Sequence, residues 1–325
     1  MARAHLGLDN RIGRRLRLRD LQILSCVAEW GSMAKAAVHL GISQPSVSEA
    51  IANLEATLAV RLLDRSPRGV EPTVYAHALL KRGLVVFDEL RQGIRDIEFL
   101  ADPTTGEVRI GCSESMAAGL VPSIIDEFSR EHLQVVFRLL DANTASLEFR
   151  ELRERSVDLM IGRISRPLAD DDINVEVLFD DPFFVVAGAK SRWARRRKID
   201  LAELVDEPWI LVEPDNVVYS LLAEAFRARG LAIPLARVSS NSIQIRMHLL
   251  ATGRFLTLHA GSVLRHNAGR WSLKALPVDF GFQQLPVAIV TLKNRTLSPA
   301  AQRFIECARA VTNSMSFSSD AASFR

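Results

Sequence analysis

The chain has 325 residues, of which 48% are hydrophobic and 24% are charged. This composition is typical of globular proteins and excludes collagen-like, disordered and disulfide-scaffold classes. A chain of this length exceeds what one hydrophobic core supports, so we expect two or three domains. It has no uncharged apolar run approaching the roughly 20 residues that span a bilayer, and no apolar secretory segment follows the basic N-terminus. We therefore expect a soluble, cytoplasmic protein with no membrane partner.

Positive charge is concentrated at the N-terminal end. Residues 1–100 contain 14 Lys/Arg and 11 Asp/Glu, whereas residues 101–325 contain 27 of each. Residues 1–19 alone contain six arginines and one acidic residue. This asymmetry indicates a contact with nucleic acid or another acidic surface, and a merely solubilising arm is the alternative. We assign residues 1–16 as a basic arm.

Three helices are predicted within the first sixty residues. Apolar residues recur on one face of residues 18–29. Ser32 is well placed to cap a second helix over 33–40, which Gly41 terminates. A third helix begins at Ser43. A turn of about four residues that includes a glycine, between two short helices, is typical of a helix-turn-helix.

The solvent face of the third helix is polar and carries no lysine or arginine. Short or planar polar side chains at the front of such a helix can reach base edges in the major groove. A three-helix core without DNA contacts would show the same apolar stripes, but the polar face favours DNA binding. The candidate DNA-binding residues in these helices are Ser32, Gln44, Pro45, Ser46, Ser48, Glu49 and Asn53.

Residues 61–73 are predicted to form two short extended segments around a Ser-Pro-Arg-Gly turn. Such a β-wing places Arg65 and Arg68 at its tip, where they can enter a minor groove or bind phosphates. An exposed hairpin with solvated arginines is the alternative. Because the third helix lacks basic residues, we expect phosphate affinity to come from the wing and the arm.

The segment from Arg17 to about Gly83 resembles the winged helix-turn-helix of LysR-type transcriptional regulators. The matching residues, in the family's order and spacing, are Gly31–Ala37, Leu40, Ser43–Ser48, Ile51, Leu54–Glu55 and Leu62–Arg65. The resemblance implies an N-terminal all-α winged helix-turn-helix domain, a long linker helix and a C-terminal α/β two-lobed periplasmic-binding-protein-like domain. It also implies activation or repression of target genes in response to a small-molecule effector, homodimers or homotetramers, and contact with RNA polymerase.

After the DNA-binding domain (residues 17–72), residues 73–101 are predicted to form one long helix. Apolar residues recur along it at alternating spacings of four and three, a seven-residue repeat. The helix would be about 40 Å long and would expose an apolar seam, which a second chain buries best. Packing against its own C-terminal domain is the alternative. We expect a homodimer on a two-fold related double-stranded operator, with the dimerisation residues Leu80, Phe87, Leu90, Ile94 and Ile97.

After a hinge at residues 102–106, strands and helices alternate along the chain. This pattern predicts an α/β fold with mainly parallel sheets. The chain is expected to cross from a first lobe (about 107–182 and 286–312) to a second lobe (about 183–285) and to return. Residues 313–325 are expected to form a frayed tail. The helices expected in this effector domain span 117–131, 146–155, 217–229, 242–252 and 299–312.

Polar residues follow several predicted strands, at the edge where α/β sheets bind ligands beside helix N-termini. Hydroxyl and amide groups next to free backbone N–H donors suit a carboxylate, phosphate or hydroxylated ligand, so we expect a polar or anionic effector. Each such residue is also simply a good N-cap, and Arg163 is alternatively a surface side chain. The candidate effector-binding residues are Ser113, Ser115, Asn143, Thr144, Arg163, Asn241 and Ser242.

No motif supports a different function. Cys26, Cys112 and Cys307 form no CxxC or Cys/His cluster, so neither a metal site nor a disulfide framework is predicted. There is no Walker A loop, HExxH or G-x-G-x-x-G, and Gly111–Ser115 lacks the last glycine of G-x-S-x-G, so no enzyme and no cofactor are predicted. Redox sensing through Cys112 and pure solute binding are the remaining alternatives, and the helix-turn-helix opposes the second.

Overall fold

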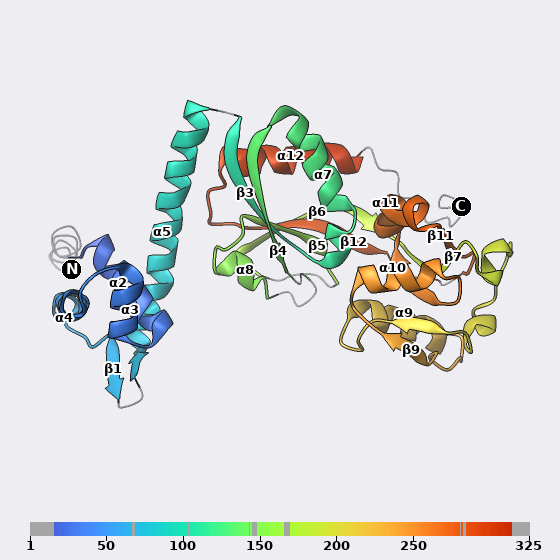
Figure 1. The fold of residues 1–325 in the computed structure, drawn as a ribbon, viewed down its shortest axis with the longest axis horizontal. Helices are drawn as coiled ribbons and strands as arrows, with labels where there is room; N and C mark the ends of the chain where they lie inside the picture. The colour runs from blue at the N-terminus through green and yellow to red at the C-terminus, as the bar shows by residue number, and fades with distance from the viewer. Residues whose placement is uncertain are drawn as a thin grey trace. The chain divides into compact units, whose positions relative to one another are not determined.

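The chain folds into two compact units, residues 1–91 and 92–325, whose elements are drawn in Figure 1. The basic arm and the C-terminal tail expected from the sequence lie outside the described residues, apart from Leu16 and Asn313. In the described part of the chain, no helix is long and apolar enough to cross a membrane. The computed structural model describes residues 16–66, 69–102, 104–142, 144, 148–165, 170–279, 281 and 284–313, with only the backbone described at Arg65 and Ser66.

The N-terminal unit contains the three expected helices and the expected hairpin. Helices α2 and α3 end at Gly31 and Gly41, which adopt the left-handed conformation that glycine tolerates best. Ser32 and Ser43 cap the following helices by accepting a backbone N–H bond. The elements are α2 Leu18–Trp30, α3 Met33–Leu40, α4 Gln44–Leu58, β1 Leu63–Ser66 and β2 Gly69–Pro72.

The apolar faces of these helices meet in one core. Leu24, Val27 and Ile51 are completely buried there, and Ala36 on α3 is small enough for its neighbours to approach closely. Burial of each large aliphatic side chain contributes about 1.5–3 kcal/mol. This core fixes the orientation of α4 within the unit.

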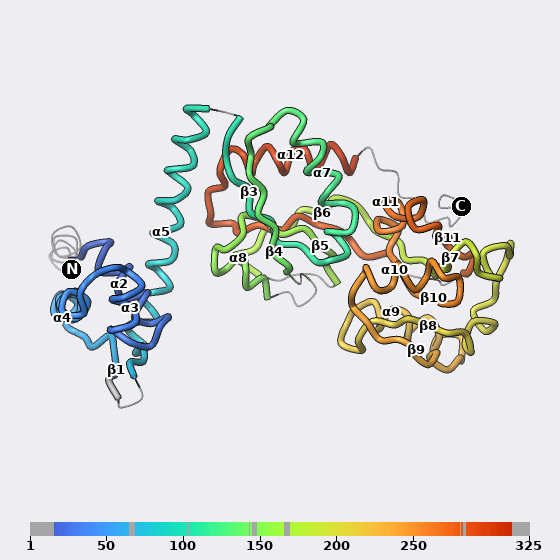
Figure 2. The backbone as a smooth tube through the Cα atoms, in the orientation of Figure 1, coloured from blue at the N-terminus to red at the C-terminus, as the bar shows by residue number. Residues whose placement is uncertain are grey.

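A single helix, α5 Val74–Ala101, follows the hairpin and confirms the predicted long helix (Figure 2). The Thr73 hydroxyl accepts a hydrogen bond from the Ala76 backbone N–H at 3.3 Å and so caps its first turn. Ala76 and Leu80 pack against the N-terminal core. The beginning of α5 is therefore part of the N-terminal unit.

The end of α5 is attached to the C-terminal unit by ion pairs. Arg95 contacts Glu107 at 3.1 Å and the buried Asp158 at 3.4 Å. Asp158 also accepts hydrogen bonds from two further arginines. The boundary between the units consequently falls inside α5 and not at the expected hinge 102–106, where Thr105 already begins strand β3.

One lobe of the C-terminal unit, called lobe 1, contains both the beginning and the end of that unit. It is built on a five-stranded sheet of order β4-β3-β5-β12-β6. Its core includes Ile124 and Phe128 of α7 and Phe304 of α12, the last two in ring contact at 5.7 Å. Its elements are β3 Thr105–Cys112, α6 Glu114–Ala117, α7 Leu120–Glu131, β4 Gln134–Asp141, α8 Arg150–Arg153, β5 Leu159–Arg163, β6 Ile173–Asp181, β12 Leu285–Leu292 and α12 Pro299–Asn313.

The other lobe, called lobe 2, has a five-stranded sheet of order β11-β7-β10-β8-β9. Trp209 and Phe226 pack edge to face in its core, and the Trp209 indole donates to the Leu204 carbonyl at 2.7 Å. Its elements are β7 Phe183–Gly188, β8 Trp209–Leu211, α9 Val217–Arg227, β9 Ala236–Ser239, α10 Ile243–Ala251, β10 Leu256–Ala260, α11 Gly261–Trp271 and β11 Leu273–Ala275, with 3₁₀ helices at Arg192–Arg195 and Leu201–Leu204.

Both sheets are mixed, so the expectation of mainly parallel sheets is wrong. In lobe 1, β3 is parallel to β4 and β5, but β12 is antiparallel to β5 and β6. In lobe 2, β8 is parallel to β9 and β10, but β7 is antiparallel to β10 and β11. The antiparallel strands are those next to the connections between the lobes, namely β6, β7 and β12. Antiparallel neighbours do not need the helical crossover that parallel neighbours require.

Two expected helices are shorter than the sequence pattern indicates. The helix expected over 117–131 is interrupted at Gly119, where a Cβ would lie 2.6 Å from the His266 ring. In the described part of the helix expected over 146–155, which begins at residue 148, only α8 is helical, and the flanking Phe149 adopts a positive φ of 45°. Close packing at the first site and local backbone geometry at the second override the helical pattern.

Candidate functional site

One face of α4 is polar and exposed. Gln44, Pro45, Glu49 and Asn53 are exposed on it, whereas Val47 on the opposite side is completely buried. Pro45 lies in the first turn, where its missing N–H removes no helical bond. The fold therefore presents four of the sequence candidates on a surface that a major groove can accept.

The three serine candidates are placed differently. Ser32 caps α3 with its side chain. The Ser46 hydroxyl lies 2.8 Å from that of Ser43 in the first turn of α4. The Ser48 hydroxyl donates to the Met33 sulfur at 3.3 Å and is part-buried between α3 and α4. Ser48 is thus directed toward the protein interior, unlike the other candidates on α4.

The hairpin β1–β2 forms the predicted wing, with Arg65 paired to Val70 across it. The Val70 backbone N–H donates to the Gly31 carbonyl at 3.0 Å, which joins the wing to the turn between α2 and α3. A Cβ at Gly69 would lie 2.8 Å from the same carbonyl oxygen, and its φ of 131° also requires glycine. Arg68 lies outside the described residues.

Helix α5 exposes an apolar strip. Its members are 42–79% exposed: Val86, Leu90, Ile94, Ile97 and Leu100. Phe87 is half-buried, and Leu80 packs partly against the core of its own unit. Three of the five dimerisation candidates therefore lie on the exposed strip, and a strip of this kind is typical of an interface.

Three effector candidates lie together at one edge of lobe 1. Strands β3 and β5 are parallel neighbours, so the residues after their carboxyl ends meet. The Arg163 guanidinium donates to the Ser115 hydroxyl at 2.8 Å, and the Ser115 and Ser113 hydroxyls are 3.0 Å apart. Sequence reasoning predicted this group of residues.

Arg163 is buried and connects the two lobes. Its Nη2 donates to the Asp181 carboxylate at 2.5 Å and to the Ser262 hydroxyl of lobe 2 at 3.0 Å. Asp181 also accepts from the Ser262 backbone N–H at 2.9 Å and hydroxyl at 2.6 Å. The Arg163 guanidinium carbon lies 5.4 Å from the centre of the Phe183 ring. The surface alternative for Arg163 is therefore wrong, because its charge is held by a buried counter-charge.

Thr144 is buried and supports Arg163 from behind. Its hydroxyl donates to the Arg163 backbone carbonyl at 3.0 Å. A Cβ at Gly162 would lie 2.1 Å from that hydroxyl, so this contact needs a glycine. Thr144 thus positions the strand end by a backbone contact, while Asn143 lies outside the described residues.

The two candidates on lobe 2 bond to neighbouring loops. The Asn241 side-chain oxygen accepts from the Glu213 backbone N–H at 3.3 Å. Ser242 caps α10 and its hydroxyl donates to the Glu114 carboxylate of lobe 1 at 3.3 Å. Ser242 and Glu114 therefore form a second contact between the lobes, apart from that of Arg163.

Sequence reasoning missed Asp181, Ser262, Arg246 and His259 as site residues. Asp181 ends β6 directly before the chain enters lobe 2, and a charged residue at a strand end was the available signal. Ser262 lies in α11, a helix that the sequence did not predict. The N-cap residue of α11 is Ala260, whose side chain cannot accept a hydrogen bond, so the usual start signal of a helix is missing.

Arg246 and His259 add buried nitrogen groups beside this contact. His259 is 2% exposed, and its Nε2 has no hydrogen-bond partner among the described residues. Burial, reinforced by Arg246 and Arg163, lowers the pKa of His259 well below its ordinary 6.5. The histidine is therefore neutral at physiological pH, and the positive charge here belongs to the arginines.

Cys112 has the properties of a small core residue. It is 3% exposed, and burial, with a smaller effect from Asp141, raises the pKa of its thiol to about 11. A reactive cysteine needs the opposite shift. The redox alternative loses support, and the described residues contain no cluster of His, Cys, Asp and Glu able to bind a metal ion.

Comparison with known proteins agrees with this architecture. The family model of bacterial LysR-type regulatory helix-turn-helix proteins matches residues 18–77, and that of the LysR substrate binding domain matches residues 101–313. The chain is 27% identical over 300 residues to the HTH-type transcriptional regulator GbpR of Azospirillum brasilense, covering 92% of this chain and 87% of the relative. It is also 27% identical to the transcriptional dual regulator GltC of Bacillus subtilis, over 90% of this chain and 96% of the relative.

Solved structures share the fold. A full-length OxyR variant from Pseudomonas aeruginosa superposes with a TM-score of 0.62 at 21% identity, covering 92% of this chain and 95% of that one. Full-length CbnR complexed with its target DNA gives a TM-score of 0.51 at 20% identity, covering 91% and 100%. The chain therefore belongs to the LysR family: it is a DNA-binding transcriptional regulator and not an enzyme, with a helix-turn-helix domain and a domain that binds a small-molecule effector.

Proposed function

We propose that this regulator senses a polar or anionic small molecule between its two lobes and in response changes how its dimers hold a two-fold related operator and contact RNA polymerase. The proposal that an effector binds between the lobes is supported mainly by the buried Arg163, which donates hydrogen bonds to Ser115 of lobe 1 and to Ser262 of lobe 2. Its Nε has no partner among the described residues. A ligand that bonds to this guanidinium is sensed by both lobes at once.

The response follows from population shift. A ligand changes the balance between two lobe arrangements only by the difference of its affinities for them. The hydrogen bonds Arg163–Ser262 and Glu114–Ser242 join the lobes, so a different arrangement of the lobes would change them. A ligand that competes for these groups therefore has the required difference in affinity.

On the DNA side, α4 supplies sequence recognition and the wing with the basic arm supplies phosphate affinity. Gln44, Glu49 and Asn53 are exposed on α4, which has no basic residue. A dimer formed through Leu90 and Ile97 of α5 would present two such helices to one operator. We place the protein in the cytoplasm, where such an operator is found.

The DNA part is tested with operator sequences selected from a random library by the full-length protein. Arg65→Ala with Arg68→Ala should weaken binding to all DNA and reduce the slope of log K against log salt by about 0.9 for each phosphate that is no longer neutralised. Gln44→Ala should instead change the selected sequence. Arg227→Ala on lobe 2 is the matched control and should change neither. An unaltered salt slope in the double variant would remove the wing from the interface.

The effector part is tested by thermal unfolding of the full chain in the presence of carboxylic acids, phosphates and sugars. A true effector at 100 times its Kd stabilises the protein by about 2.7 kcal/mol and should alter the DNase footprint on the operator. Arg163→Gln should abolish both effects, whereas Arg130→Gln, on the surface of α7, should preserve them. A footprint that stays the same with every ligand that binds would contradict the proposal.

A further inference from the structure

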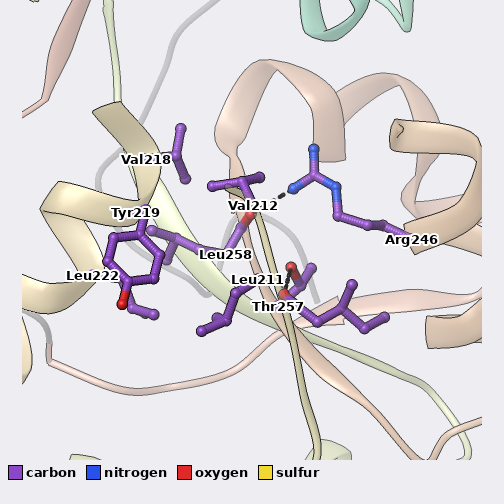
Figure 3. Close-up of a pocket in the computed structure, with 9 residues that line it drawn as sticks. Leu211, Val212, Val218, Tyr219, Leu222, Arg246, Thr257 and Leu258 are labelled. Atoms are coloured by element: carbon purple, nitrogen blue, oxygen red, sulfur yellow. Dashed lines mark hydrogen bonds between the residues drawn. The ribbon is translucent and has the colours of Figure 1, made fainter. Parts of the chain in front are cut away.

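Lobe 2 is closely packed between β8, α9 and β10. The cavity drawn in Figure 3 has a volume of about 10 Å³, which is about what one water molecule needs. Beside it, Arg246 donates to the Leu258 carbonyl at 3.4 Å. This region has no room for a ligand, whereas the surface of the same lobe carries an excess of charge.

The charge of residues 101–325 sums to zero but is divided unequally between the lobes. Lobe 2, taken as residues 183–285, contains 14 Lys/Arg and 8 Asp/Glu. The remainder of residues 101–325 contains 13 Lys/Arg and 19 Asp/Glu. A surface with an excess of one sign attracts partners of the opposite sign before they make direct contact. Lobe 2 is therefore suited to an acidic partner.

The positive charge of lobe 2 is densest in one surface loop, residues 190–198, termed the basic loop. It follows β7 and contains six cationic residues and no acidic residue. A short segment rich in Lys and Arg is typical of a site for a polyanion. All six cationic residues are exposed: Lys190, Arg192, Arg195, Arg196, Arg197 and Lys198.

Two buried residues fix the backbone of the basic loop. Trp193 packs into the core of lobe 2, and its indole N–H donates to the Glu207 carboxylate at 2.9 Å. Ile199, directly after the loop, is buried, and its backbone N–H donates to the Pro277 carbonyl at 3.2 Å. Because the segment between them is held at both ends, its cations are presented to a partner at a low cost in conformational entropy.

Only part of the charge of the basic loop is neutralised within lobe 2. Arg192 forms an ion pair with Glu207. Arg196 forms one with Glu203 at 3.0 Å. The guanidinium carbons of both arginines also lie over the Trp193 ring, 5.0 and 5.8 Å from its centre. Within the part of the chain that the structure describes, the other four cationic side chains form no ion pair: Lys190, Arg195, Arg197 and Lys198.

The surroundings of the basic loop favour nucleic acid over an acidic protein as its partner. The centre of a protein–protein interface is usually apolar. Among the described residues from 183 to 234, no large hydrophobic side chain is exposed, so the loop lacks such a centre. Its unpaired Arg195 and Arg197 carry planar guanidinium groups, which bind phosphate oxygens in a bidentate manner. A phosphodiester backbone therefore fits the loop best.

We propose that the basic loop of lobe 2 is a second DNA contact of this regulator and binds backbone phosphates of the operator duplex. This contact is additional to those of α4, the wing and the basic arm, and it holds other phosphates than they do. The only helix in the loop is the single 3₁₀ turn Arg192–Arg195, which is too short to lie along a major groove. The loop therefore adds affinity and no sequence recognition.

The test is the salt dependence of operator binding by the full-length protein, on a duplex that extends beyond the wild-type footprint on both sides. Arg195→Gln with Arg197→Gln should reduce the slope of log K against log salt by about 1.8, since about 0.9 is lost for each phosphate that is no longer neutralised. The operator sequence selected from a random library should not change. Arg195→Lys with Arg197→Lys keeps the charge and should keep the slope.

The matched control is Arg227→Gln with Arg237→Gln, which removes two exposed arginines from the same lobe outside the loop. It lowers the total charge by the same amount and should leave the slope unchanged. Because all four arginines are exposed, both glutamine variants should unfold at the wild-type temperature, so a loss of DNA binding is not a loss of fold.

Hydroxyl-radical footprinting on the same duplex locates the contact. The wild-type protein should protect a stretch of backbone that the Arg195→Gln, Arg197→Gln variant leaves unprotected, while protection at the centre of the operator remains. An unchanged slope with an unchanged footprint overturns the proposal, and so does an equal loss of slope in the Arg227→Gln, Arg237→Gln control. If the loop variant binds DNA normally but no longer regulates transcription in vitro, its partner is an acidic protein and the proposal fails.

Discussion

Replacing Asp181 with asparagine removes the negative charge at the junction of the lobes and keeps the shape of the side chain. Asp181 is completely buried and bonds to Arg163 and Ser262. In the variant, the Arg163 guanidinium remains buried opposite a neutral amide, and the loss of one partner from such a pair costs about 3–5 kcal/mol. For a unit of this size each kcal/mol lowers Tm by about 2–4 °C, so we expect a decrease of roughly 6–20 °C.

Thermal unfolding of the full-length protein, followed by tryptophan fluorescence, measures this effect. Trp193, Trp209 and Trp271, three of the four tryptophans, lie in lobe 2, so the signal reports mainly on the C-terminal unit. Asp126→Asn is the control, since Asp126 forms an exposed pair with Arg130 that contributes at most about 1 kcal/mol. If the two variants unfold within about 2 °C of each other, the buried pair does not stabilise the lobes as argued.

Three further predictions follow from burial and charge. Ile97→Asp places a carboxylate on the exposed strip of α5 and should convert the proposed dimer to a monomer on a sizing column, whereas Glu98→Gln should not. His259 binds no proton when folded but binds one below pH 6.5 when unfolded, so stability should fall below pH 6.5 by up to about 1.4 kcal/mol per pH unit for this group; His259→Leu should show a shallower dependence in denaturant titrations. With a pKa of about 11, the Cys112 thiol should react with Ellman's reagent at pH 8 only after unfolding, and rapid labelling in the native protein would restore the redox alternative.

The N-terminal unit is predictable because its signals are local. Gly31 and Gly41 directly follow the helices that they end. Ser32 and Ser43 directly precede the helices that they cap, and each accepts a hydrogen bond from a backbone N–H three residues further on. The seven-residue repeat of α5 is likewise visible in the sequence alone. Periodicity does not show which apolar residues of the repeat stay exposed and which pack within their own unit. Leu80 belongs to the repeat but packs partly on the N-terminal core.

The contact between the lobes is not predictable in the same way, because its partners are far apart in the sequence. Arg163 and Ser262 are 99 residues apart, and Ser262 lies in the unexpected helix α11. That helix has alanine at its N-cap position, and the Asp181 carboxylate, 81 residues upstream, accepts the Ser262 backbone N–H in its place. A helix capped by a distant strand lacks the start signal that local patterns supply.

Strand β5 links the two polar networks of the C-terminal unit. Asp158, which anchors Arg95 of α5, directly precedes this strand, and Arg163 ends it. All five residues of β5 are buried, and the strand is paired on one side with β3 and on the other with β12. Sliding it would break ladder bonds on both sides, whereas the Glu114–Ser242 contact between the lobes involves exposed groups. A ligand at the proposed site beside Arg163 would therefore change the lobe contacts at lower cost than it would distort lobe 1, to which Arg95 joins the end of α5.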